Sequence, residues 1–237
     1  MRWELNGSQS YRKIVRPYNA LLKAAQDARI FRRNKRPLRS KILACLLYLS
    51  GLSYRGMTYQ TGMIRASHVS VCRWVHAMRG IISRVPTRER RVVAIDETKL
   101  KIKGRQVFVW AAMDTDTREL LAVYASYYRS NINTLVFLKR VLSTCTNRPV
   151  VLVDGGPWYP WALERYGLKW LHITFGERNC IERFFRTLKE RTRRFYNNLP
   201  TTRLDNLESY VNLFMTWYNH LRKHQGLGRI PLEVTLS

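Results

Sequence analysis

The spacing of apolar residues in the first third of the chain is helical. Apolar side chains recur every three or four positions over 38–50 and again over 68–82, and 54–61 fits a short helix between them. Breaks that contain glycine separate the three segments. Helix, short helix, turn and basic helix is an order typical of a helix-turn-helix. We therefore predict a helix-turn-helix DNA-binding domain over 38–85, preceded by a basic arm or helix over 1–37.

The pattern changes after a charged linker at 86–91. Short apolar or alternating runs follow, bounded by turn residues, and these predict strands. Longer segments with helical spacing lie between and after them. The predicted strands are 92–95, 99–103, 106–113, 120–126, 150–153 and 170–173, and the predicted helices are 132–142, 158–166, 179–196 and 204–221. We expect an α/β (mixed α+β) fold over 92–237, in which helices flank a mixed sheet.

The composition indicates a folded protein of the cytoplasm. Hydrophobic residues make up 46% of the 237 positions, which is enough for a sizeable core. The longest apolar run, 42–52, is too short to span a membrane, and the first ten residues lack the apolar segment of a secretory signal. The four cysteines are far apart and never form C-x-x-C, so we expect reduced thiols and neither a disulfide scaffold nor a zinc ribbon.

The net charge points to a polyanionic partner. The chain has 42 Lys and Arg against 16 Asp and Glu, a formal charge of +26, and arginine favours bidentate contacts with phosphate. Nucleic acid is therefore the expected partner, and a nucleoid-associated location follows from it. A ribosome-associated protein and a binder of anionic membranes are the alternatives. No segment has the basic, Trp/Phe/Leu-rich amphipathic face that membrane binding requires.

The predicted helix at 68–82 is a candidate for reading DNA. One face is apolar and is expected to be buried, and it consists of Val69, Cys72, Val75 and Met78. The opposite face is basic, and its DNA-contacting residues are predicted to be Arg73, His76 and Arg79. The alternative is an ordinary helical domain with a solvated basic face.

Two wholly apolar strands each end at an aspartate. Asp96 follows 92–95 and Asp154 follows 150–153. If these strands are parallel neighbours, both carboxylates lie at the same edge of the sheet, where α/β proteins place their sites. Carboxylate oxygens are ligands that Mg²⁺ and Mn²⁺ prefer, and a cation between the two would relieve their repulsion. The alternative is that both are turn residues at strand ends.

A third carboxylate is offered by the predicted helix at 179–196. Glu182 shares a helical face with Arg186 and Lys189, so a metal-binding carboxylate would lie beside cations that hold phosphates. The alternative is a surface glutamate that pairs with Arg186.

Four blocks of sequence are more specific than these patterns. They read IDETKLKIKG at 95–104, DGGPWY at 154–159, RNCIERFFRTLKER at 178–191 and YNHLRKHQGLG at 218–228. The first three resemble the signature blocks of DDE transposases of the IS-six-type insertion-sequence family, especially its archaeal members. The fourth resembles the tail shared with retroviral-integrase-like recombinases. The resemblance covers 38–237, about four fifths of the chain.

The resemblance implies an RNase H-like catalytic core behind a helix-turn-helix. It places the catalytic, metal-binding acids at Asp96, Asp154 and Glu182, with two Mg²⁺ or Mn²⁺ ions. Because 28 positions separate Asp154 from Glu182, an interval shorter than in the bacterial members, Glu177 and Glu164 are alternative third acids. Many relatives carry an N-terminal zinc ribbon, but no cysteine precedes position 45 here, so no zinc is expected.

The activity implied is transposition of an insertion sequence. The enzyme would bind the terminal repeats and target as double-stranded DNA, nick the element ends and transfer the strands, as a homodimer or larger synaptic assembly. Residues expected to contact DNA in the core are Lys99, Lys101, Arg186, Lys189, Arg193 and Arg194. A domesticated, non-catalytic DNA-binding protein and an RNase H-like nuclease are the alternatives.

Overall fold

The chain divides into two compact units, Met1–Ile82 and Ser83–Ser237, and each is described by itself. The structure is a computed structural model that describes residues 18–19, 21–23, 25–31, 35–78, 85–173, 176–199, 201–231 and 234, without the side chain at 194. Within this part, no helix combines the length and the apolar character that crossing a membrane requires.

In the described part of the first unit, residues 18–19, 21–23 and 25–27 are helical, and two longer α-helices follow with a π-helical turn between them. Helix α2 spans Leu38–Leu49, η1 spans Gly56–Gln60 and α3 spans His68–Met78, and α2 packs on α3. The buried residues of α3 are Val71, Val75 and Met78. The prediction that Val69 lies on this face was wrong, because Val69 is 46% exposed. A spacing of four and then three positions keeps the buried side chains on one side of a helix with 3.6 residues per turn.

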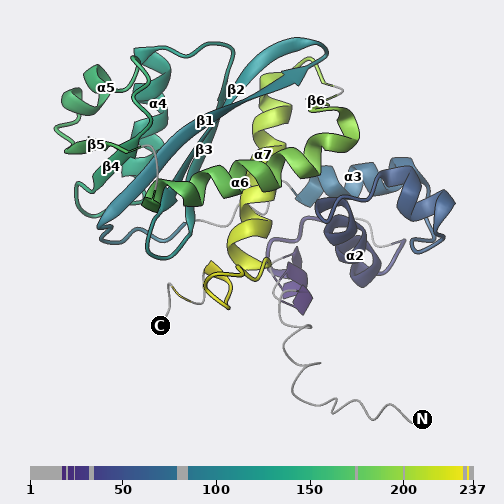
Figure 1. Ribbon diagram of the computed structural model, residues 1–237. Helices are drawn as coiled ribbons and strands as arrows, with labels where there is room; N and C mark the ends of the chain where they lie inside the picture. Colours follow the sequence, from purple (N-terminus) through teal and green to yellow (C-terminus); the bar gives the residue numbers. More distant parts are fainter. Residues whose placement is uncertain are drawn as a thin grey trace, which may run out of the picture. The chain divides into compact units, whose positions relative to one another are not determined.

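The second unit is built on one mixed sheet (Figure 1). Its strands are β1 Val92–Ile102, β2 Arg105–Asp114, β3 Leu120–Ser126, β4 Val150–Val153, β5 Trp170–His172 and β6 Asn198–Leu199. The order across the sheet is β3-β2-β1-β4-β5, and β6 pairs with the far end of β1. Strands β1 to β3 form an antiparallel meander, whereas β4 and β5 run parallel to β1. The predicted mixed sheet with flanking helices is therefore confirmed.

Helices cover both faces of this sheet. They are α4 Asn131–Leu142, α5 Pro160–Arg165, α6 Asn179–Thr192 and α7 Leu204–His220, with the short 3₁₀ turns η2 Gly176–Arg178 and η3 Arg193–Phe195 at the ends of α6. The core beneath α4 and α5 includes Ile95, Trp110 and Phe137. Helices α6 and α7 pack on β1, β2 and β3, with Phe184 and Phe214 in ring contact. Side chains alternate along a strand, so successive residues of β1 face different helices.

The Asn219 side chain joins helix α7 to the sheet, because it forms hydrogen bonds with strand backbone as a neighbouring strand would. The amide of Asn219 donates to the backbone oxygen of Leu120 at 2.8 Å, and its oxygen accepts from the Leu120 backbone nitrogen at 2.9 Å. Both residues are buried. The first residue of β3 thus has its polar backbone groups satisfied by a helix 99 positions later.

Candidate active site

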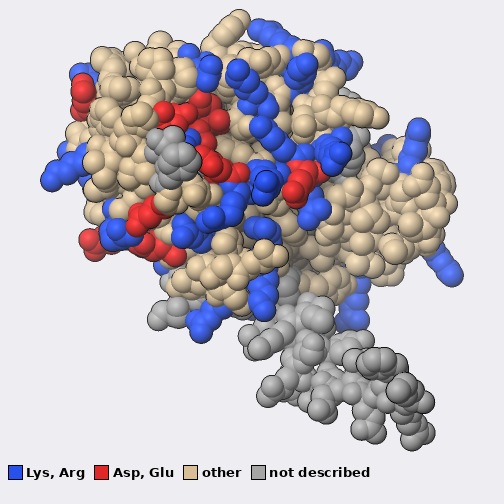
Figure 2. Space-filling view, in the orientation of Figure 1, with Lys and Arg blue, Asp and Glu red and all other residues tan. Residues whose placement is uncertain are grey.

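Basic side chains gather around a group of acidic side chains on one face (Figure 2). The residues predicted to contact DNA that lie exposed in the second unit are Lys99, Lys101, Arg186, Lys189 and Arg193. In the first unit, Arg73 and His76 are exposed on α3. Arg79 and the side chain of Arg194 lie outside the described residues.

The parallel pairing of β1 with β4 brings Asp96 and Asp154 to one edge of the sheet. The last paired residues are Ala94 and Leu152, and each aspartate lies two positions further along its own strand direction. This is the placement that the sequence predicted for parallel neighbours. One detail was wrong: Asp96 does not end its strand, because β2 pairs with β1 as far as Ile102. The short strand β4 ends here, so β1 continues beyond this edge without β4 as a neighbour.

Glu182 is the third acid that the fold brings to this edge. It lies in the first turn of α6, and it is joined to the two aspartates through Arg178. Nη2 of Arg178 lies 2.9 Å from Oδ2 of Asp96 and 3.8 Å from Oδ2 of Asp154, while Nη1 donates to Oε1 of Glu182 at 3.0 Å. The ion-pair partner of Glu182 is therefore Arg178, one turn before it, and not Arg186 as the alternative had it.

The carboxylates surround the guanidinium and do not meet at a common point. In the part of the chain that the structure describes, no three His, Cys, Asp or Glu side chains are arranged to hold a metal ion directly. Three carboxylates nevertheless share one cation, so the cluster has an excess of acidic groups when they are ionised. Oxygen ligands of this kind suit Mg²⁺ or Mn²⁺, so the chemistry of the donor set fits a hard divalent cation.

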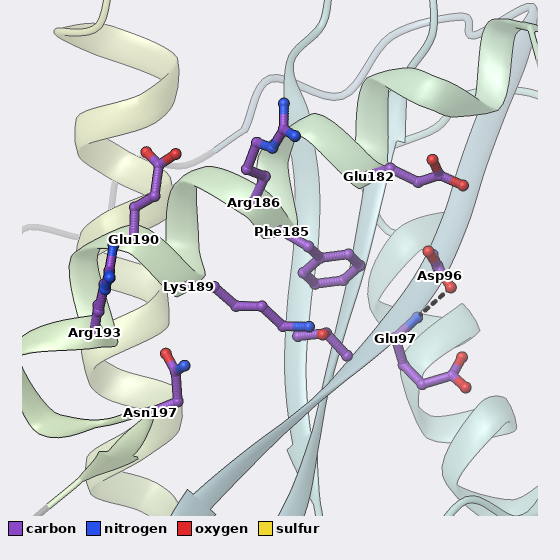
Figure 3. Close-up of a pocket in the computed structure, with 10 residues that line it drawn as sticks. Asp96, Glu97, Glu182, Phe185, Arg186, Lys189, Glu190, Arg193 and Asn197 are labelled. Atoms are coloured by element: carbon purple, nitrogen blue, oxygen red, sulfur yellow. Dashed lines mark hydrogen bonds between the residues drawn. The ribbon is translucent and has the colours of Figure 1, made fainter.

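The surroundings of Asp96 oppose its ionisation. Burial raises the pKa of Asp96 to about 7, the nearby Arg178 guanidinium acts against this shift, and the carboxylates of Glu97 and Asp154 add to it. The backbone N–H of Glu97 donates to Oδ1 of Asp96 at 2.9 Å (Figure 3). An additional positive charge would favour the carboxylate form of Asp96.

Glu97 carries a fourth carboxylate, on the side of β1 opposite to Asp96. Its side chain is only 3% exposed. It accepts a hydrogen bond from the Tyr159 hydroxyl and one from Nη1 of Arg129 at 3.3 Å. Arg129 in turn stacks 4.1 Å over the Trp158 ring. Burial raises the pKa of Glu97, and the contacts with Tyr159 and Arg129 act against that shift.

The turn after β4 requires both of its glycines. Gly155 has a φ of +83°, in the left-handed region, and the ring of His172 fills the space beside it. At Gly156, an added Cβ would lie 2.6 Å from the ring of Trp158. The backbone N–H of Gly156 donates to Oδ1 of Asp154 at 3.2 Å, so this turn also orients the aspartate.

A groove of about 540 Å³ leads from the acids along α6 (Figure 3). It is lined by Asp96, Glu97, Thr98, Glu182, Phe185, Arg186, Lys189, Glu190, Arg193 and Asn197. A smaller hollow shares Asn197 with it and is lined by Lys99 and Lys101 among others. The groove is thus acidic at the sheet edge and mainly basic along the helix.

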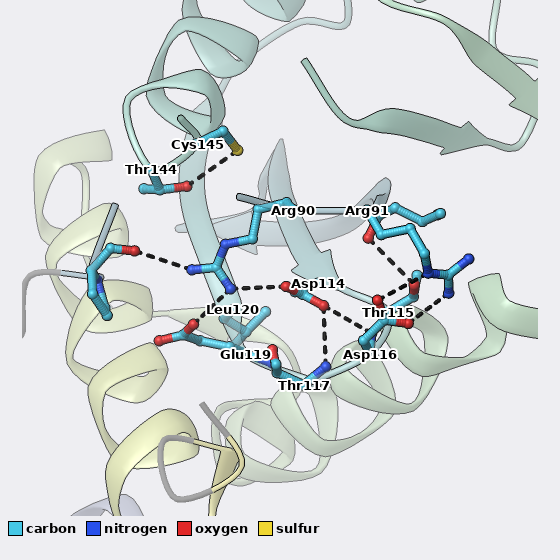
Figure 4. Close-up of polar contacts among 12 residues, drawn as sticks. Arg90, Arg91, Asp114, Thr115, Asp116, Thr117, Glu119, Leu120, Thr144 and Cys145 are labelled. Carbon is cyan, nitrogen blue, oxygen red and sulfur yellow. Dashed lines mark hydrogen bonds and ion pairs between the residues drawn. The ribbon is translucent and has the colours of Figure 1, made fainter. Parts of the chain in front are cut away.

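A buried ion cluster fixes the start of β1 (Figure 4). Nη1 of Arg90 lies 2.8 Å from Oδ2 of Asp114 and 2.9 Å from Oε2 of Glu119, and Nη2 donates to the Pro86 carbonyl at 3.2 Å. All three charged side chains are almost fully buried. The cluster ties the entry of β1 to the turn between β2 and β3.

The two alternative third acids lie elsewhere. Glu164 is exposed on α5, and Glu177 faces Arg91 at 3.4 Å. Among the described residues, the contacts that join Asp96 and Asp154 to a third carboxylate pass through Arg178 to Glu182 alone.

Neither Arg178 nor the Glu97 contacts behind Asp96 were predicted from the sequence. A signal for Arg178 was present, since Arg and Glu four positions apart at a helix start form a typical ion pair. The contacts of Glu97 with Tyr159 and Arg129 had no such signal, because they join residues 62 and 32 positions apart.

Residues 90–224 match the family of DDE domains of the IS240 type. The chain is 40% identical over 198 residues to an uncharacterized protein of Methanocaldococcus jannaschii. The alignment covers 83% of this chain and 92% of that protein. A chain in the structure of the simian T-cell lymphotropic virus intasome with PP2A regulatory subunit B56 gamma aligns with a TM-score of 0.52 and 17% identity, over 82% of this chain and 74% of that one. The HTLV-2 integrase catalytic core domain in complex with magnesium aligns over 63% and 98% of the two chains, with a TM-score of 0.49 and 16% identity. The predicted RNase H-like fold is confirmed.

Proposed function

Since the chain belongs to the DDE domain family of the IS240 type, we propose that it is the transposase of an insertion sequence of the IS-six type. Its DDE transposase-like domain would bind the DNA of the element ends, nick one strand at each end and join the freed strand to target DNA. Asp96, Asp154 and Glu182 are the acids to which we assign this chemistry.

One observation carries the proposal. Three carboxylates from a long strand, the end of a short strand and a helix meet around a single guanidinium, with contacts of 2.9, 3.8 and 3.0 Å. They come from positions 58 and 28 residues apart in the sequence. A protein that only binds DNA gains nothing from three carboxylates beside its basic surface, because they repel phosphate.

The acids would hold the divalent cations of the reaction. Two Mg²⁺ or Mn²⁺ ions bound by these carboxylates would supply activation of the attacking oxygen and stabilisation of the leaving oxygen. In nicking, a water oxygen bonds to phosphorus as the bond to the 3′-oxygen breaks. In strand transfer, the resulting 3′-hydroxyl attacks a target phosphodiester and displaces its 3′-oxygen, so the number of phosphodiester bonds is unchanged and no nucleotide triphosphate is consumed.

The basic wall of the groove would position the DNA backbone. Arg186 and Lys189 follow Glu182 on the groove side of α6, and Arg193 continues this wall. Cations at this spacing hold phosphates on either side of the reacting one, which fixes the scissile bond at the acids. Lys99 and Lys101, exposed on β1, extend the cationic surface beyond Asn197.

The first unit would recognise the terminal repeats. Arg73 and His76 project from α3, and we assign them, together with Arg79, to contacts with element-end DNA in a helix-turn-helix. Two ends must be held together for transposition, so we expect a homodimer or a larger synaptic assembly on DNA.

The assignment is tested with the full chain, its own element ends and Mn²⁺ or Mg²⁺. Asp96→Asn and Glu182→Gln should each abolish metal-dependent nicking and joining while the affinity for DNA is retained. Glu164→Gln, which changes an exposed acid on α5, is the matched control and should retain activity.

Each other result has a defined meaning. Joining by the Asp96→Asn variant contradicts the assignment of the acids. Metal-dependent nicking without joining of a pre-cut end identifies a nuclease. Salt-dependent DNA binding without any cleavage identifies a domesticated DNA-binding protein.

A further inference from the structure

The guanidinium of Arg178 lies at the centre of the acidic site. Its side chain is 6% exposed, and it contacts Asp96, Asp154 and Glu182 at once. It belongs to η2, directly before α6, so it reaches back from the start of the helix to the edge of the sheet.

The shape of the guanidinium makes this arrangement possible. Nη2 lies within ion-pair distance of the two aspartates and Nη1 donates to the glutamate, so the planar fork bridges β1, the end of β4 and α6. A lysine at this position would offer one nitrogen on an unbranched stem. The arginine therefore does more than neutralise charge, because it also fixes the separation of the carboxylates.

Arg178 and a divalent cation require the same oxygens. Oδ2 of Asp96 lies 2.9 Å from Nη2 of the guanidinium, and Oε1 of Glu182 accepts from Nη1 at 3.0 Å. A metal ion at these oxygens would lie against the guanidinium, and two positive charges in contact repel strongly in a partly buried site. The spread of the carboxylates agrees with this, since in the described residues they form no ready metal cage.

We propose that Arg178 is a resident counter-cation, a positioning residue that holds the three carboxylates together in the metal-free protein and must withdraw before a divalent cation binds. The inference rests on the proposed function, because it takes these acids as the metal ligands. A DNA phosphate offers the withdrawn guanidinium another bidentate partner. Metal ions and DNA would therefore bind cooperatively, and the idle protein would bind metal weakly.

The test measures Mn²⁺ binding to the DNA-free full chain by titration calorimetry. Arg178→Gln should bind Mn²⁺ at least tenfold more tightly than the wild type, because the competing charge is gone. Arg178→Lys, which keeps the charge but not the fork, should bind at least threefold more tightly. Arg186→Gln removes the same charge from the exposed groove wall of α6 and should change the affinity less than threefold.

Thermal unfolding supplies a second measurement. Without metal, Arg178→Gln should melt several degrees below the wild type, because the three acids repel one another, and saturating Mn²⁺ should restore most of the loss. Arg186→Gln should show neither effect.

The outcomes separate this inference from the proposed function. If Asp96→Asn abolishes Mn²⁺ binding but Arg178→Gln and Arg178→Lys bind Mn²⁺ no more tightly than the wild type, the counter-cation is refuted and the metal site stands. If neither the wild type nor any Arg178 variant binds Mn²⁺, both are refuted. Binding by Arg178→Gln at concentrations where the wild type shows none supports both.

Discussion

At the scale of single residues, the turn that presents Asp154 has no room for a larger side chain. We predict that Gly156→Ala lowers the free energy of unfolding by about 1–3 kcal/mol, because its methyl group would overlap the Trp158 ring, which also contacts Arg129 and Tyr159. Nicking should fall as well, since the Gly156 N–H orients Asp154. Urea denaturation and a nicking assay measure the two effects.

Gly226→Ala is the control for this substitution. An added Cβ there meets the His224 ring at 3.5 Å, an ordinary contact, so the stability should change by less than about 0.5 kcal/mol. Equal losses in the two variants would show that the Trp158 contact does not decide the outcome.

The acids of the candidate site could be predicted from the sequence, but the cation between them could not. Asp96 and Asp154 each follow an apolar run, which makes them conspicuous on a chain with only 16 acidic residues. Arg178 is one of 42 basic residues, and its spacing from Glu182 indicates an ion pair but not its burial among three acids. Its role depends on three partners that the fold brings together from distant segments.

At the scale of secondary-structure elements, strand β1 depends on the ion cluster at its entry. Arg90→Leu should destabilise the protein by about 3–5 kcal/mol, because it leaves the buried carboxylates of Asp114 and Glu119 without their cation. Chemical denaturation of the full chain measures this loss. The second unit should also lose protection from amide exchange at the start of β1.

The neighbouring residue provides a matched control. Arg91 pairs with Asp116 at 2.6 Å, but its side chain is 60% exposed. Arg91→Gln should therefore leave the denaturation midpoint almost unchanged, because solvent screens an exposed ion pair. A cost as large as that of Arg90→Leu would mean that burial of the cluster is not what makes it important.

The periodicity of apolar residues predicted the helices and strands, and the errors concerned the positions at which they end. The predicted end of a strand at Asp96 was wrong because β2 supplies partners as far as Ile102, which a count of apolar residues does not show. The predicted helix end at 196 was late, because α6 gives way to a 3₁₀ turn at Arg193. The sequence did not show that β1 and β4 are parallel neighbours, although the placement of the two aspartates depends on it. The structure shows this pairing.

At the scale of the whole molecule, the charge of +26 should govern the binding to DNA that we propose. The logarithm of the binding constant should fall steeply and linearly with the logarithm of the salt concentration. Arg186→Gln and Lys189→Gln should each reduce that slope by about 1, if each holds one phosphate. Fluorescence anisotropy with labelled element ends measures the slope, and Arg165→Gln, exposed on α5, should leave it unchanged.

Two histidines near the C-terminal end of the fold should each reduce the stability in mild acid because they are held neutral, whereas the raised pKa of Asp96 acts in the opposite direction. Burial lowers the pKa of His220 and of His224 below the usual 6.5. Below about pH 6.5 the two histidines bind protons in the unfolded chain but stay neutral in the native protein. Their contribution to the free energy of unfolding therefore decreases as the pH falls towards the lowered native pKa. Each ring contributes at most about 1.4 kcal/mol per pH unit.

The double variant His220→Gln/His224→Gln isolates this effect. Its melting temperature should fall less than that of the wild type between about pH 7.5 and about pH 5. Parallel curves for the two proteins would assign the acid sensitivity to other groups.

The two hydrogen bonds between Asn219 and Leu120 have a consequence for the protein during its synthesis. When the ribosome has just added Glu182, all three acids have been made but α7 has not. Helix α7 covers β3, and its Asn219 bonds the backbone of Leu120, 99 positions earlier. Until α7 is made, apolar strand surface stays open to water. A message cut short at this point would encode all three acids of the candidate site in a chain whose β3 lacks its cover, and we expect such a chain to aggregate.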